Sequence, residues 1–144
     1  MTENGMGHFA GKHPPGHKAE PRVIDAVEQR AKGRELSCAA AFRIAGDLKA
    51  RPGEVGLAVD LLDMRLAKCQ MGLFGYRPEK RVVKPAESVS EEMEKAIQAA
   101  LVNQRLPCRA AWDIAERFSI PKMKVAAACE ALDVKISSCQ LGAF

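Results

Sequence analysis

Four cysteines have the chemistry to bind a metal or form disulfides: Cys38, Cys69, Cys108 and Cys139. The members of each pair, 38 with 69 and 108 with 139, would be neighbours if the segment before one helix paired with a strand that follows the next helix. The Cys-x-x-Cys spacing typical of zinc sites is absent, and cytoplasmic thiols are normally reduced. We therefore expect buried structural thiols, with a disulfide, a redox pair or a four-cysteine metal centre as the alternative. Cys129 falls on an apolar helix face and is interpreted as a small hydrophobe.

The remaining reactive side chains predict no catalytic site. All three histidines, His8, His13 and His17, are irregularly spaced in the first 20 residues, a Gly- and Pro-containing segment that we interpret as a flexible tail. Asp63 and Asp133 follow helical patterns, where capping of the next turn is the expected role. No Gly-rich phosphate loop occurs, and no serine has a histidine partner within the predicted folded part. We expect a protein that is not an enzyme, with no cofactor and no small-molecule substrate.

Composition limits the architecture. The 144 residues suffice for one ordinary domain or two very small ones, and 47% hydrophobic with only 5% aromatic residues favours helices over a β-sandwich. No apolar run approaches the roughly 20 residues that a bilayer span needs. The N-terminus also lacks the apolar stretch of a secretory signal, so we expect a cytoplasmic protein without a membrane partner.

An internal repeat organises the chain. Residues 36–74 and 106–144 are identical at 14 of 39 positions when shifted by 70, where composition alone would give roughly 3. The expected organisation is therefore a tail over 1–20, a first repeat over 21–76, a basic wing or linker over 77–89 and a second repeat over 90–144. The two repeats should share one fold.

Sequence patterns in the second repeat predict its elements. Ser90 is the expected N-cap of a first helix, residues 105–108 are extended because Pro107 disfavours helical angles at Leu106, and a second helix ends near Ser119. Apolar residues from 125 to 132 at helical spacing predict a third helix, and alternation over 134–139 predicts a short strand.

This order resembles the winged helix-turn-helix superfamily. The resemblance rests on small and aliphatic positions that let two short helices cross closely. They are Ala111, Ile114, Ala115, Ile120, Val125, Ala128 and Leu132, repeated as Ala41, Ile44, Ala45, Val55, Ala58 and Leu62. The resemblance implies a mainly α fold of two tandem winged-helix-like units, each with a helix, a short strand, a helix-turn-helix and a strand. A turn over 72–80 and a returning strand over 81–84 would form a wing in the first unit.

The family's usual role would place each third helix in a DNA major groove, where Arg, Lys, Asn or Gln read base edges. The face expected to point away from the core instead has Gly53, Glu54, Gly56, Leu57 and Asp60 in the first copy and Met123, Lys124, Ala126, Ala127 and Glu130 in the second. Neither set contains a side chain that pairs bidentately with a base, and small residues such as Gly56 permit close approach of a second helix.

We therefore expect a regulatory or adaptor protein that acts by binding. Its third helices would dock a protein surface, which is an external partner, a second copy or the other repeat. The expected protein-binding residues are Gly53, Glu54, Leu57, Met123, Lys124 and Ala127.

The alternative is a DNA-binding transcriptional regulator. In it, basic residues of the wing would contact phosphates with help from the second unit. These residues are Arg77, Lys80, Arg81, Lys84, Lys122 and Lys124.

Overall fold

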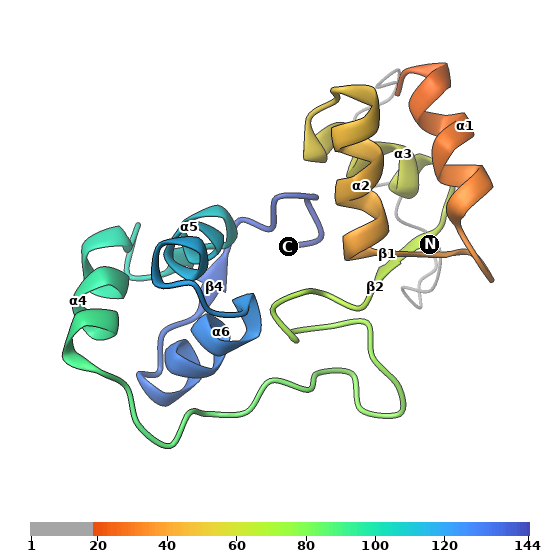
Figure 1. Cartoon of the computed structure of the whole chain (residues 1–144). Helices are drawn as coiled ribbons and strands as arrows, with labels where there is room; N and C mark the ends of the chain where they lie inside the picture. Colours follow the sequence, from red (N-terminus) through yellow and green to blue (C-terminus); the bar gives the residue numbers. More distant parts are fainter. Residues whose placement is uncertain (1–18) are drawn as a thin grey trace. The chain divides into compact units, whose positions relative to one another are not determined.

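The computed structural model describes residues 19–144, and the predicted tail with His8, His13 and His17 lies outside them except for its last two residues. The first five elements are α1 (Pro21–Arg30), β1 (Glu35–Ser37), α2 (Cys38–Leu48), α3 (Pro52–Leu61) and β2 (Arg65–Ala67). The next five are α4 (Glu91–Ala100), β3 (Leu106–Pro107), α5 (Cys108–Phe118), α6 (Lys122–Ala131) and β4 (Ile136–Ser137) (Figure 1). The prediction of a mainly helical chain is confirmed. None of the helices within 19–144 has the length and apolarity needed to cross a membrane.

The backbone repeats with the same period as the sequence. The helices α1, α2 and α3 begin and end 70 residues before α4, α5 and α6, respectively. Residues with positive φ also recur at this spacing, in a conformation that side chains other than Gly adopt at some cost. The recurring pairs are Gly33 with Asn103, Arg34 with Gln104, Lys49 with Ser119, Asp63 with Asp133, Lys68 with Ser138 and Gly72 with Gly142. Local geometry is thus equivalent at matched positions, including the turns expected at Asp63 and Asp133.

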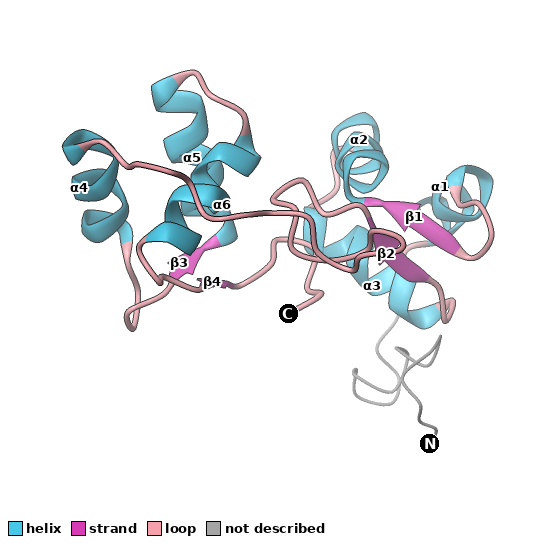
Figure 2. Ribbon diagram, turned by 90° about the horizontal axis from the view of Figure 1, so that it is seen from below, coloured by secondary structure: helices cyan, strands magenta, loops and turns pink. Residues whose placement is uncertain are grey.

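The chain forms two compact units whose boundaries differ from those of the sequence repeats. The first unit ends at Cys69 but also includes Leu141–Ala143, and the second comprises Gln70–Gln140 together with Phe144. Residues 70–89, expected to be divided between the first repeat and a linker, therefore belong to the second unit. Figure 2 shows this segment as an extended loop between β2 and α4.

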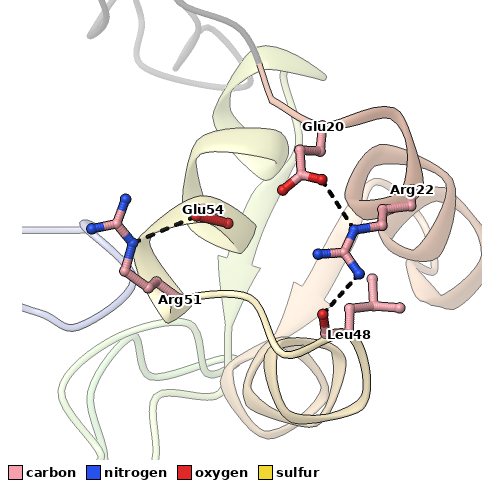
Figure 3. Close-up of polar contacts among 5 residues, drawn as sticks. All are labelled: Glu20, Arg22, Leu48, Arg51 and Glu54. Carbon is pink, nitrogen blue, oxygen red and sulfur yellow. Dashed lines mark hydrogen bonds and ion pairs between the residues drawn. The ribbon is translucent and has the colours of Figure 1, made fainter.

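The first unit is held together by helix contacts and by one pair of parallel strands. β1 pairs with β2 so that Leu36 lies opposite Leu66. Ser37 accepts a hydrogen bond from the Ala40 N–H and caps α2, while the Arg22 guanidinium donates to the Leu48 carbonyl at the other end of that helix, 2.8 Å away (Figure 3). The fully buried core has side chains from β1 and from all three helices: Val23, Val27, Leu36, Ile44, Val55 and Val59.

The second unit has the same features, namely a serine N-cap, a pair of parallel strands and a buried apolar core. Ser90 accepts a hydrogen bond from the Met93 N–H at 3.1 Å, so its predicted capping role is confirmed. β3 and β4 pair in parallel, with Leu106 opposite Ile136, although the expected strand over 134–139 is only two residues long. Ile97, Leu106 and Val125 have no exposed surface and form the centre of its core.

The wing expected over 72–84 has no returning strand, and this part of the prediction was wrong. The N–H groups of Val82 and Val83 both donate to the Gly72 carbonyl, at 2.9 and 3.1 Å. Consecutive N–H groups that share one carbonyl do not form the hydrogen-bond ladder of a β-sheet. Pro78 and Pro85, which lack an N–H, stand on either side of residues 81–84. This segment therefore packs as an irregular loop.

Candidate functional site

The third helix of each unit is buried on more than one side. Val55 and Val59 of α3 face α1 and α2, as expected, but Gly56 and Asp60 are buried too. Ala126 of α6 is only 1% exposed. The expectation that Gly56, Asp60 and Ala126 lie on an open face was wrong, because all three are buried.

The covering segment on α3 contains Leu141. A Cβ atom on Gly56 would lie 1.7 Å from the carbonyl oxygen of Leu141 and 2.7 Å from its carbonyl carbon. The Leu141 backbone therefore approaches α3 to a distance that only glycine permits. Leu141 is itself only 2% exposed.

The first turn of α3 remains accessible. Gly53 is exposed and has no atom within 4 Å of where a Cβ would be, whereas Glu54 and Leu57 are half-buried. The Glu54 carboxylate pairs with the Arg51 guanidinium at 3.5 Å, and the pair lies at the start of the helix (Figure 3). The predicted protein-binding residues of the first unit are thus partly or fully accessible to solvent.

Residues 72–86 cover part of α6 in the second unit. A Cβ on Gly72 would be 3.1 Å from the Met123 methyl carbon, and the Ala86 N–H donates to the Ala127 carbonyl at 3.0 Å. Near the end of the helix, the Arg81 guanidinium pairs with the Glu130 carboxylate. The helix face expected to dock a protein is therefore partly occupied by the chain's own loop.

A groove of about 520 Å³ remains open next to this loop. Its apolar surface comes from Met93, Ile120, Ala127 and Ala128, and the exposed Lys84 and Lys124 belong to its lining. The other lining residues are Pro85, Ala86, Glu87, Ser88, Val89 and Ser90. The structure thus brings together Lys124 and Ala127 from the expected protein-binding set with Lys84 from the expected nucleic-acid-binding set. We call this feature the α6 groove.

The six expected nucleic-acid-binding residues all belong to the second unit. Arg77, Lys80, Lys84 and Lys124 are exposed. Arg81 is paired with Glu130, and the Lys122 ammonium lies 4.4 Å from the centre of the Trp112 ring in a cation–π contact. Intramolecular contacts therefore already engage Arg81 and Lys122.

All five cysteines are free thiols, and all are buried except the half-buried Cys139. The Gln140 side-chain amide donates to the Cys108 sulfur at 3.6 Å. Burial, reinforced by the neighbouring Glu130 carboxylate, raises the pKa of Cys129 to about 11. Within residues 19–144, no three His, Cys, Asp or Glu side chains are grouped so that they could hold a metal ion.

Sequence reasoning missed Met71 and Leu141, although both are almost fully buried. Each stands in a pattern of Cys, Gln, an apolar residue, Gly, any residue and Phe, found at 69–74 and 139–144. Identity at four of six positions between the repeats, beyond the last strand of each, was the available signal. It marked these segments as structural elements.

The α6 groove is an open surface of the second unit, and the face of α3 around Gly56 is a covered surface of the first. No protein-family model, curated protein or solved structure matches this chain.

Proposed function

We propose that the chain is a non-enzymatic regulatory or adaptor protein, built from two tandem winged-helix-like units, and that the α6 groove binds a short segment of a partner protein. The observation that carries the proposal is the lining of this groove. Four apolar residues line the groove, where a side chain can leave water, and two lysines of the same lining supply positive charge.

This lining specifies the chemistry of the bound segment. Apolar contact with Met93 and Ala127 suits a medium-sized aliphatic side chain, and Lys84 and Lys124 attract a carboxylate. Glu87 also lines the groove and disfavours a second acidic group near it. The proposed ligand is an extended peptide with one aliphatic residue close to one Asp or Glu.

Selection from a phage-displayed peptide library tests this proposal directly. The intact protein should enrich peptides with an aliphatic and an acidic residue. Ala127→Trp, which fills the groove, should abolish that enrichment. Ala131→Trp is the matched control because Ala131 is exposed on the same helix and does not line the groove. Enrichment that is absent, or that is equal for wild type and Ala127→Trp, would refute peptide binding in this groove.

A DNA-binding transcriptional regulator is the second candidate, and the gathering of all six candidate cations in the second unit favours it. Phosphate binding by these residues releases counterions, so affinity for duplex DNA would fall steeply with salt. Titration of a mixed-sequence duplex at low salt separates the two functions. Binding that weakens between low and physiological salt, and that weakens further in a Lys84→Ala/Lys124→Ala variant, would support the regulator. Absence of binding at low salt would eliminate it.

A further inference from the structure

Each repeat ends in a short segment, residues 69–74 in the first repeat and 139–144 in the second. From here on, we use the word tail for these two segments and not for the N-terminal residues 1–20. The two tails have the same pattern, and the apolar residue after Gln is buried in both, Met71 at 1% and Leu141 at 2% exposed. Gly72 and Gly142 both have positive φ, 77° and 85°, so the chain turns in the same way after each buried residue. The tails are therefore equivalent structural elements.

Part of each tail belongs to the unit formed by the other repeat. Residues 70–74 are part of the second unit, although they follow the last strand of the first repeat, and Leu141–Ala143 are part of the first unit, although they follow the last strand of the second. Exchange of an identical element between two copies of a fold is the arrangement known as domain swapping, here within one chain.

The first unit's site for the tail is specific. Gly56 lies against the Leu141 carbonyl, where no Cβ fits. The equivalent residue of α6 is Ala126, so the two third helices are not interchangeable at this position. We call Gly56 and the surface around it that Leu141 covers the Gly56 site.

We propose that the Gly56 site also accepts Leu141–Ala143 from the tail of a second copy of this chain, so that two chains pair by exchanging this part of their tails. The occupant follows from the molecule itself, because the tail already packs on a unit formed by a different copy of the repeat. Binding within one chain has the advantage of a high effective concentration, on the order of millimolar for short flexible connections. Exchange between chains therefore dominates when the site and the tail of the same chain cannot meet.

Two complementary variants create that condition. Leu141→Glu prevents the tail from binding the Gly56 site, because burial of a carboxylate at this position is unfavourable. The Gly56 site of this variant is therefore open. Gly56→Val keeps the tail and blocks the site. The ¹⁵N-labelled Leu141→Glu chain is titrated with unlabelled Gly56→Val chain, and its amide spectrum is followed. Saturating shifts at the α3 amides, including Gly53 and Leu57, are expected.

The double variant Gly56→Val/Leu141→Glu is the matched titrant and should produce no shifts. Absence of α3 shifts at millimolar titrant, or identical shifts with the double variant, would overturn the proposal. If Gly56→Val does not fold, a synthetic peptide of residues 137–144 replaces it as titrant, with a Leu141→Glu peptide as control. Failure of that peptide to shift α3 amides would overturn the proposal equally. If the peptide shifts the α3 amide signals but the folded Gly56→Val chain does not, the proposal that two whole chains pair would be overturned.

Discussion

Replacement of two helical glycines by alanine should change stability in opposite directions. Gly46 in α2 has no atom within 4 Å of the position of an added Cβ, whereas Gly56 in α3 has the Leu141 carbonyl oxygen at 1.7 Å. Alanine in a helix interior is favoured over glycine by up to about 1 kcal/mol. Gly46→Ala should therefore stabilise the protein by up to about 1 kcal/mol.

Gly56→Ala receives the same helix benefit but displaces the Leu141 backbone. Overpacking costs about 1–3 kcal/mol when the neighbouring structure shifts. If the tail leaves instead, re-exposure of the Leu141 side chain costs about 2 kcal/mol. Either route exceeds the gain in helix propensity, so the free energy of unfolding should fall by about 1–2 kcal/mol.

Urea denaturation followed by circular dichroism measures both variants under one set of conditions. The expected difference in unfolding free energy between Gly46→Ala and Gly56→Ala is about 2–3 kcal/mol. A Gly56→Ala variant as stable as Gly46→Ala would show that Leu141 does not pack against α3, and the reasoning on the exchanged tails would fail with it.

Three further predictions follow from single contacts. Leu141→Ala should lower the free energy of unfolding by about 2 kcal/mol or more, whereas Phe144→Ala, at a residue 47% exposed, should have a smaller effect in the same urea titration. Ser90→Ala should destabilise the protein by about 1 kcal/mol through loss of the cap on α4, and Ser88→Ala, at an exposed position, serves as the comparison; equal losses would contradict the capping role. Because the pKa of Cys129 is raised from 9.0 to about 11, its neutral form stabilises the fold fully below pH 9, and this contribution declines as pH rises through 11. Alkylation with iodoacetamide at pH 8, mapped by mass spectrometry, should accordingly modify the half-buried Cys139 before Cys129, and the reverse order would contradict the burial of Cys129.

The helices could be predicted from sequence because their signals are local. Ser90 with three acidic residues after it marks the start of α4, and the Ile120–Pro121 pair marks the break before α6. The pairing of residues 35–37 with 65–67 followed only from the winged-helix resemblance, as one arrangement that it implies, and not from a local pattern. Periodicity and capping residues specify the position of a helix within a short stretch of sequence.

The packing of the third helices could not be predicted in the same way. The close contact at Gly56 involves a segment far away in sequence, and no local pattern identifies which segment covers which helix. Gly56 did suggest a close approach, but the approaching residue, Leu141, stands 85 positions later. The α6 groove likewise depends on the path of residues 84–90, a loop without periodicity.

The exchanged tails also determine where the chain tolerates being cut for recombinant expression. A fragment that ends at residue 89, the natural choice from the repeat boundaries, would retain Gly72 and its loop but lose Met123, which lies beside it. The complementary fragment would carry Leu141 without the helix that buries it. Each piece would therefore present apolar side chains to solvent, and such surfaces promote aggregation. Co-expression of the two pieces, which restores both missing contacts, is the appropriate strategy for dissecting this protein.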